Sequence, residues 1–209
     1  MNLKIILMVI IFTLFSGCEN SNSKKNIANT KQIVVPKGLY NIDIENSLIK
    51  WIGRTPVKSH DGTINVFEGT FTVDDRGVLN GKVIIDMNSI NCTDLSGGGK
   101  SNLEGHLKND DFFSVNNYPT STINLSSNLK IENGMINFNG NLVIKGITQP
   151  ISFKSNLEKT NSGKYLAKSS FSFDRSLYDI KYKSTSFFDD LGDKFINDNI
   201  EIEIDILTL

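Results

Sequence analysis

The chain has little histidine and little cysteine, which limits the metal chemistry it can support. Its 209 residues include two histidines, His60 and His106, and two cysteines, Cys18 and Cys92. The histidines are far apart in the sequence, with no H-E-x-x-H motif and no pair of cysteines beside them. The sequence therefore predicts no metal site, because such sites draw on closely spaced ligands.

The motifs of several common enzymes are also missing. No G-x-S-x-G occurs, which disfavours a serine hydrolase of the usual kind. The stretch "GGGKS" at 97–101 has Asp94 where a phosphate-binding loop needs its first glycine. The acidic doublets 110–111 and 189–190 are expected to be solvated turn residues, because adjacent side chains point in different directions. We predict no catalytic residue and no cofactor.

The chain lacks an excess of charge of either sign. It carries 22 Lys and Arg against 23 Asp and Glu, a net charge of −1 at pH 7, and no basic stripe. Nucleic-acid binding needs a basic surface to neutralise phosphates, so nucleic acid is not an expected partner.

No apolar run is long enough to cross a bilayer as a helix. The clearest one, Ile5 to Phe15, follows the single positive charge of Lys4 and falls well short of the roughly 20 residues needed. With the small residues Ser16 and Gly17 behind it, the run has the layout of a secretory signal peptide. Residues 1–17 are therefore predicted to be a removable export signal.

Cys18 follows these small residues directly, and "LFSGCEN" resembles the lipobox of bacterial lipoproteins. The resemblance implies that Cys18 is acylated and that the protein is exported and lipid-anchored in the bacterial cell envelope, facing the periplasm. Cys92 would then be the sole thiol, so no internal disulfide is possible. An ordinary export signal with an incidental cysteine is the alternative. Residues 18–37, rich in Asn, Ser and Lys, are expected to be a flexible tether.

From residue 38 to 209, apolar and polar residues alternate, which indicates β-strands with one buried face. The clearest run is "NIEIEIDIL" at the end of the chain. Turn signals at about 10-residue spacing indicate an all-β, antiparallel meander of roughly eight to ten strands, and we favour its closure into a β-barrel over a sandwich. Gly69 and Gly140 lie on the apolar face of their strands, where they allow curvature, leave room inside, or mark a bulge.

Residues 97–113 break the alternation and predict a short helix near one opening. Leu103 and Leu107 are four residues apart with His106 beside them, which places all three on one side of a helix. We expect this helix, with its lead Gly97 to Gly99, to form a mobile cover through which a ligand passes.

Arg175 and Cys92 are the other residues with a predicted role. Arg175 follows Phe171 and Phe173 at strand spacing and is expected to point inward, toward a carboxylate, backbone carbonyls or a ligand head group. The alternatives are a structural ion pair and a strand that ends at Asp174. Cys92 has no cationic neighbour in "NSINCTDLS" and is expected to be a small packing residue.

Three stretches together resemble the YceI family of exported proteins: "LEGHLKNDDFFSVNNYPTSTI", "GNLVIKGITQPISF" and "FSFDRSLYDIKY". The resemblance covers about residues 40–209. It implies an all-β, antiparallel, lipocalin-like β-barrel of roughly eight strands with a short helix near one opening. It also implies that the barrel binds an apolar or amphiphilic lipid, a polyisoprenoid or an isoprenoid quinone, for carriage, storage or sensing. A filled barrel that acts as a structural or interaction module of the envelope is the alternative, and a homodimer stays open.

The strand parities and this resemblance together predict the site. The expected lipid-binding residues inside the barrel are Trp51, Phe67, Phe71, Phe138, Leu142, Phe153, Phe171, Phe173, Ile180 and Tyr182. His106 and Arg175 are expected at the head group or rim. Leu103, Leu107, Phe112 and Phe113 are expected to form the cover.

Overall fold

Antiparallel strands dominate the structure, a computed structural model that describes residues 33–129 and 135–209. The predicted export signal and Cys18 lie outside the described residues. The strands found in the described part of the chain are β1 (Gly38–Asn41), β2 (Leu48–Arg54), β3 (Ser59–Val73), β4 (Leu79–Cys92), β5 (Thr120–Ser127), β6 (Met135–Ile144), β7 (Ile147–Lys159), β8 (Tyr165–Asp174) and β9 (Asn199–Leu207).

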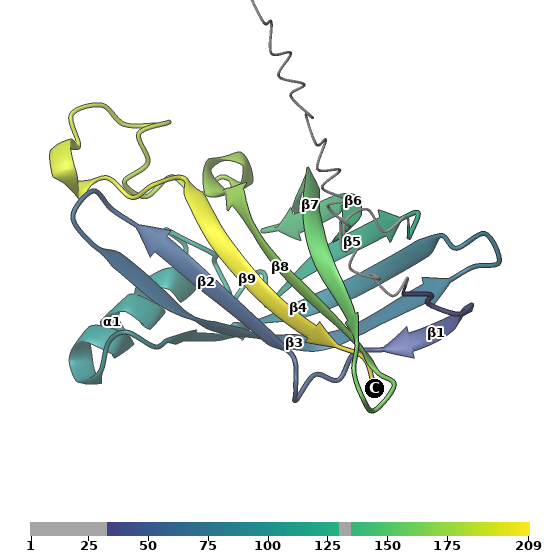
Figure 1. Ribbon diagram of the computed structural model, residues 1–209. Helices are drawn as coiled ribbons and strands as arrows, with labels where there is room; N and C mark the ends of the chain where they lie inside the picture. Colours follow the sequence, from purple (N-terminus) through teal and green to yellow (C-terminus); the bar gives the residue numbers. More distant parts are fainter. Residues whose placement is uncertain (1–32, 130–134) are drawn as a thin grey trace, which may run out of the picture. The chain divides into compact units, whose positions relative to one another are not determined.

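The sheet closes on itself (Figure 1). Its strand order is β1-β3-β2-β9-β8-β7-β6-β5-β4, and β3 pairs with β4 to complete the ring. β1 pairs with the end of β3 and β2 pairs with its beginning, so the two short strands share one edge of β3 and fill one position. The result is the closed antiparallel barrel of eight strand positions that the sequence predicted.

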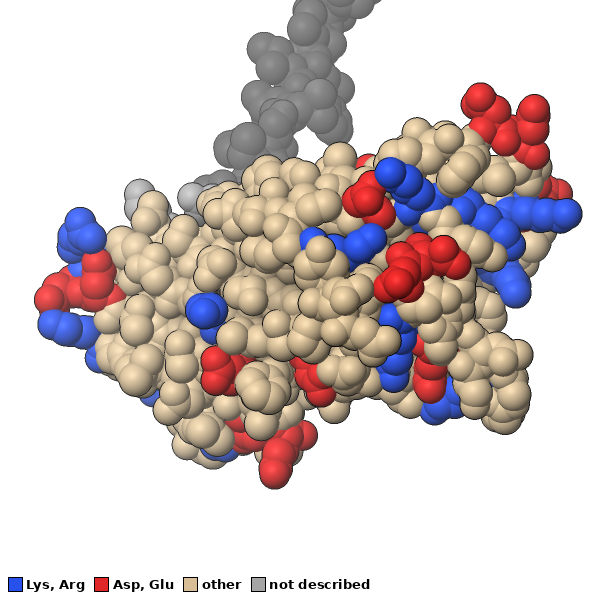
Figure 2. Space-filling view, turned by 180° about the vertical axis from the view of Figure 1, so that it is seen from behind, with Lys and Arg blue, Asp and Glu red and all other residues tan. Residues whose placement is uncertain are grey.

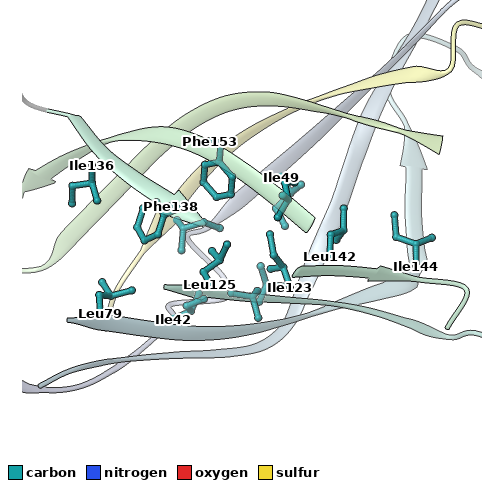
Figure 3. Packing of buried hydrophobic residues seen from close by; sticks show 14 of the residues in the cluster. Ile42, Ile49, Leu79, Ile123, Leu125, Ile136, Phe138, Leu142, Ile144 and Phe153 are labelled. Atoms are coloured by element: carbon teal, nitrogen blue, oxygen red, sulfur yellow. The ribbon is translucent and has the colours of Figure 1, made fainter. Parts of the chain in front are cut away.

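The alternation of the sequence accounts for the barrel's interior. In β9, Ile200, Ile202, Ile204 and Ile206 all line the inside of the barrel. β5 and β7 show the same period, with buried residues at every second position along most of their length. Figure 3 shows how buried side chains from several strands meet inside the barrel. Their burial removes apolar surface from water at about 25 cal/mol per Å², which is the main term that stabilises the fold.

Phe67 is the clearest departure from the predicted parity. It is 60% exposed, whereas Val66 is 6% exposed and takes the inward position. The register between β3 and β4 shifts between Val66 and Glu68, which leaves Phe67 as the extra residue of a β-bulge. Since one extra residue moves the neighbouring side chains to the opposite face, the prediction that Phe67 lies inside is wrong.

The two mid-strand glycines do not leave room for a ligand. A Cβ atom at Gly140 would meet the backbone oxygen of Asn124 on β5. A Cβ atom at Gly69 would meet the side chain of Ile42. Each glycine therefore allows a neighbouring group to approach closely, and the space above it is filled by protein.

The helix α1 (Gly97–Lys108) follows β4 and is joined to β5 by residues 109–119. The predicted short helix is confirmed, but Gly97 to Gly99 are its first residues and not a lead in front of it. Two short 3₁₀ helices, η1 (Arg175–Tyr178) and η2 (Gly192–Lys194), lie in the long connection from β8 to β9. Figure 1 shows α1 and η2 at the same end of the barrel, opposite the C-terminus.

The described surface carries charges of both signs. Figure 2 shows Lys and Arg interspersed with Asp and Glu on the face it displays, with uncharged surface between them. Among the described residues, no helix combines the length and apolar character needed to cross a membrane.

Candidate functional site

The barrel encloses a cavity of about 230 Å³. It is therefore not filled, as an entirely packed barrel would be. Its walls come from most of the strands, from α1, and from the connections that flank them. Seven of the predicted interior residues line it: Trp51, Phe71, Phe138, Leu142, Phe153, Phe171 and Phe173.

A group of phenylalanines forms one wall of the cavity. Phe153 stacks on Phe171 with ring centroids 4.4 Å apart and an angle of 14° between the ring planes. Phe138 lies 5.5 Å from Phe153 on the neighbouring strand, and Figure 3 shows these two side chains in the interior. Stacked and tilted rings of this kind give a rigid apolar surface, because each ring restrains its neighbour.

Trp51 is held in place at another wall. Its indole N–H donates to the backbone oxygen of Thr63 at 3.2 Å. The ring lies over Gly62, where any Cβ atom would collide with it. Because the only polar atom of the side chain is bonded to the backbone, the indole presents an apolar face to the cavity.

Besides Phe67, two of the predicted interior residues do not border the cavity. Ile180 is fully buried behind it, in the connection after β8. Tyr182 is half-buried and packs against His106, with ring centroids 4.3 Å apart. Both residues follow Asp174, where β8 ends, so neither lies on a strand. The 3₁₀ helix η1 begins at the next residue, so the parity no longer applies.

The segment from α1 to Phe113 lines one side of the cavity. That it moves as a cover through which a ligand passes stays a prediction. Leu103, His106 and Leu107 line it from the helix, and Phe112 and Phe113 line it from the turn after the helix. Phe113 N–H donates to the backbone oxygen of Leu107, which holds this turn against the end of the helix.

Arg175 is inside the fold but does not reach the cavity. Its Nη1 donates to the backbone oxygens of Ile180 and Tyr182 at 3.2 and 2.9 Å, and its Nη2 donates to that of Ile196 at 3.0 Å. Asp198 Oδ1 lies 3.0 Å from Nη2 as the ion-pair partner. The guanidinium is 0% exposed, so the expectation of a head-group role at the rim is corrected. Arg175 instead holds together the loops around η1 and η2.

The burial of Arg175 has an electrostatic consequence. Burial lowers the pKa of the guanidinium, while the carboxylates of Asp198 and Asp174 oppose this. Ser184 and Ser186 hydroxyls both donate to Asp198 Oδ2 at 2.8 Å, which orients the carboxylate. The arrangement is the structural ion pair that the sequence left open as an alternative.

A second polar cluster, missed by the sequence analysis, lies where β3, β4 and the start of α1 meet. His60 Nδ1 is 2.7 Å from Asp94 Oδ2, and the Cys92 thiol donates to Asp94 Oδ1 at 3.0 Å. Burial alone would raise the pKa of Asp94, but hydrogen bonds from Cys92, His60 and Asp61 lower it to about 2. Burial and the neighbouring Asp94 raise the pKa of Cys92, which is 0% exposed, as expected for a packing residue.

His60 also lines the cavity, near Arg54 and Thr55 of the β2–β3 hairpin. Only the inward parity of His60, Gly62 and Ile64 in β3 could have identified it from the sequence. Arg54 forms a two-pronged ion pair with Glu201, at 2.6 and 3.0 Å. Arg54 and His60 are therefore already engaged with protein partners, and so is His106 Nδ1, which lies 3.3 Å from Asn109 Nδ2, whereas His106 Nε2 has no hydrogen-bond partner among the described residues.

The other end of the barrel is closed by packed side chains. Ile136, Leu157 and Tyr165 are buried there and do not border the cavity. Tyr165 packs edge-on against Tyr40 with ring centroids 5.6 Å apart. Ile136, Leu157 and Tyr165 form what we call the floor of the barrel, and the cavity ends above it.

The described residues contain no group of His, Cys, Asp and Glu that could hold a metal ion. The doublet 110–111 lies in the turn after α1, where Asp110 accepts a hydrogen bond from the Ser114 hydroxyl. The doublet 189–190 is exposed in the connection from β8 to β9.

The fold is similar to several solved structures. The crystal structure of Burkholderia cenocepacia BcnA matches with a TM-score of 0.64 and 14% identity, over 80% of this chain and 99% of that one. A polyisoprenoid binding domain from Saccharophagus degradans, implicated in plant cell wall breakdown, matches with a TM-score of 0.57 and 12% identity, over 81% and 97% of the two chains. At these identities the similarity shows the fold.

Sequence relatives match about half of the chain. A UPF0312 protein of Pseudomonas aeruginosa is 31% identical over 96 residues, which cover 46% of this chain and 48% of the relative. Protein YceI of Salmonella newport is 30% identical over 96 residues with the same coverage. The chain thus spans about half the length of the curated relatives it matches. The family model of the YceI-like domain matches residues 40–207, nearly the whole barrel, and the chain therefore belongs to the YceI family.

Proposed function

We propose that the barrel binds an apolar or amphiphilic lipid with an isoprenoid-type chain, a polyisoprenoid or an isoprenoid quinone, for carriage, storage or sensing. The observation that carries this proposal is the cavity that runs from α1 to the phenylalanine wall, lined almost wholly by apolar side chains. Enclosed apolar cavities of this kind in small barrels suit one elongated hydrophobic ligand.

The lining suits the chain of such a ligand. Each five-carbon prenyl unit moved from water into the cavity contributes about 4 kcal/mol, at roughly 0.8 kcal/mol per carbon. Ordering of the ligand and loss of its free motion offset much of this gain. Contact with Ile, Phe and Trp side chains is therefore enough to retain a chain of a few units.

The Saccharophagus degradans domain, which is described as polyisoprenoid binding, has the same fold. This similarity supports the ligand class. A binding role needs no catalytic step, and the ionisable side chains lining the described cavity are Arg54, His60 and His106. His60 and Arg54 are paired with carboxylates, which fits binding better than proton transfer.

We also propose that the protein is exported and anchored by two acyl chains on Cys18, with residues 18–37 as the tether. Two chains hold a protein stably at a membrane, whereas one alone is marginal. Cys18→Ser should move the protein to the soluble fraction. A variant that stays membrane-bound after a high-salt wash would contradict the anchor.

The ligand proposal is tested by organic extraction of the protein purified from its native host, followed by mass spectrometry. We expect an isoprenoid-type lipid in the extract. The protein from which lipid has been removed should then bind a short prenyl alcohol, with a saturable change in the fluorescence of Trp51, the sole tryptophan of the chain. An extract without lipid together with no saturable change would overturn the proposal.

A further inference from the structure

We propose that two loops beside the mouth of the cavity dock onto the surface of a lipid bilayer with zwitterionic head groups. The loops are residues 55–58, in the hairpin between β2 and β3, and residues 184–188, in the connection from β8 to β9. We call them the mouth loops. The inference rests on the proposed function and deepens it, because it names the surface from which the lipid enters the barrel.

The cavity reaches the molecular surface beside the mouth loops. Arg54 and Thr55 line it at the start of the hairpin, and the side chain of Arg54 is 48% exposed. Ile196 lines it from the connection that leads into β9. Figure 1 shows the β2–β3 hairpin and η2 at the same end of the barrel. Since the floor closes the opposite end, this end is the way in for a lipid.

Hydrogen bonds hold the two mouth loops side by side. Residues 196–197 bridge them, because their backbone N–H groups donate to the backbone oxygens of Lys183, at 2.9 Å, and of Arg54, at 2.8 Å. In the second loop a turn holds Phe187 and Phe188, whose N–H groups donate to the same backbone oxygen at 3.2 and 3.0 Å. The two loops therefore form one rim at the entrance of the cavity.

Both mouth loops expose large apolar side chains. Val57 is 72% exposed in the hairpin, and Phe187 and Phe188 are 43% and 50% exposed in the second loop. Single exposed apolar residues are common on protein surfaces, whereas a group of them beside the entrance of an apolar cavity is typical of an interaction site. Loop tips of this kind suit the interface of a bilayer, into which each side chain can insert separately.

The charges of the mouth loops and their flanks nearly cancel. Residues 55–58 and 181–194 hold four lysines against three aspartates, which leaves a net charge of +1. The Lys181 ammonium lies 2.7 Å from the Asp179 carboxylate and 5.3 Å from the centre of the Phe187 ring. Attraction to acidic head groups needs a cluster of basic residues, which this surface does not offer. Apolar insertion therefore supplies the binding, and a zwitterionic bilayer is the partner that fits.

The proposed anchor keeps a bilayer within reach of this end. Ile33, the first described residue, is 15 residues from Cys18, a span of up to about 50 Å for an extended chain. The chain joins the barrel at the floor, where the Val34 backbone oxygen accepts from the Tyr165 hydroxyl at 3.2 Å. β3 has 15 residues and is about 50 Å long, and strand tilt makes a barrel shorter than its strands. The tether is thus long enough for the mouth to face the membrane that holds the anchor.

The first experiment measures contact between the mouth and a bilayer. Val57→Trp in the full chain adds a fluorophore at the tip of the hairpin, and the parent chain gives the signal of Trp51 alone. We expect brominated phosphatidylcholine vesicles to quench the added fluorescence. Leu39→Trp is the matched control, because Leu39 is 64% exposed and pairs with Thr72 at the far end of β3. No quenching at residue 57, or equal quenching at residue 39, would overturn the inference.

The double variant Phe187→Ser/Phe188→Ser should reduce the quenching at residue 57 about fivefold or more, because two apolar rings no longer enter the bilayer. Phe67→Ser is the control, since Phe67 is 60% exposed on β3 and does not belong to the mouth loops. It should leave the quenching within about twofold. Added phosphatidylglycerol or salt should change the quenching by less than about threefold. Docking that requires the acidic lipid would overturn the choice of a zwitterionic surface.

A transfer measurement separates this inference from the proposed function. Neither Phe187 nor Phe188 lines the cavity, so the double variant should bind a soluble prenyl alcohol within about twofold of the parent. It should take up the same alcohol from vesicles about tenfold more slowly, because it no longer docks. Trp51 fluorescence follows both. If neither protein binds the alcohol, the proposed function is wrong. If both bind it and take it up equally fast, lipid binding stands and the docking of the mouth loops is wrong.

Discussion

Arg175 Nη1 donates to the backbone oxygen of Tyr182 at 2.9 Å, and this bond fixes the loop that packs behind His106. The same guanidinium bonds the backbone oxygens of Ile180 and Ile196. One side chain therefore joins the segment after η1 to the segment after η2. The end of the barrel that borders the cavity depends on this connection.

Arg175→Met should lower the free energy of unfolding by about 3–5 kcal/mol. The substitution leaves several buried carbonyls and the carboxylate of Asp198 without their partner, and breaking a buried pair in this way is costly. Urea unfolding measures the change. Arg76→Met is the control, because Arg76 is 83% exposed in its pair with Asp74 and should change stability by less than about 1 kcal/mol. Similar losses in the two variants would contradict the structural role of Arg175.

Gly140→Ala should destabilise the barrel, in contrast to alanine at an open glycine. The new Cβ atom would press on the Asn124 backbone in β5, so two paired strands must separate or the variant must fail to fold. Gly105→Ala, in α1, meets nothing within 4 Å and should stabilise the helix by up to about 1 kcal/mol. Thermal unfolding of both variants gives the comparison. A Gly140→Ala protein as stable as the parent would show that β5 can shift at no cost.

The alternation of apolar and polar residues was sufficient to predict the barrel. In β9, no bulge or break interrupts the run from Ile200 to Ile206, so every residue on that face lies inside. Phe138, Phe153 and Phe171 obey the same rule. These positions could be predicted because the period of two is a local property of an unbroken strand.

The predictions for Phe67 and Arg175 failed because their strands are interrupted, by a bulge in one case and by a strand end in the other. The local alternation of residues indicates neither interruption. At Phe67 it is the bulge against β4, which depends on the register of a partner strand. At Arg175 it is the end of β8, where the Asp174 carboxylate accepts from Ser176 N–H and turns the chain into η1. The His60–Asp94 pair was missed because its two residues meet only through the pairing of β3 with β4.

Asp94 should make the stability depend on pH in acid. Its pKa is lowered from 3.8 to about 2 in the folded protein, so the stabilisation is complete above the unfolded value and is lost as the pH falls through about 2. Asp94→Asn should therefore cost about 1–2 kcal/mol at pH 6, after allowance for partial exposure, and progressively less below pH 4. Urea unfolding across this range provides the test.

The matched control for Asp94 is Asp75→Asn, which removes a surface carboxylate paired with Lys37. Those two side chains are 79% and 65% exposed, so little stability should depend on the pair. If Asp94→Asn lowers the free energy of unfolding by the same amount at pH 3 as at pH 6, the hydrogen bonds from His60 and Cys92 do not stabilise the charged form of the Asp94 carboxyl group.

Ala167 offers a way to test whether the floor of the barrel limits the length of the lipid chain. It lines the cavity on β8, two residues from Tyr165, which belongs to the packed floor. Ala167→Phe should raise the floor and shorten the space for a chain. We expect the affinity for a long prenyl alcohol to fall at least tenfold, because one excluded prenyl unit removes about 4 kcal/mol of burial before offsets.

The affinity of Ala167→Phe for a chain short enough to stay above the new ring should remain within about threefold of that of the parent, because its contacts are unchanged. Lys168→Phe is the matched control, since Lys168 is the next residue of β8, is exposed, and would place the same ring outside the barrel. Trp51 fluorescence gives the affinities, and thermal unfolding shows whether each variant keeps its fold. An equal loss for short and long chains in a folded Ala167→Phe protein would mean that the ring blocks entry and that the chain does not extend from α1 toward the floor. Unchanged binding of both would place the lipid elsewhere in the cavity, away from β8.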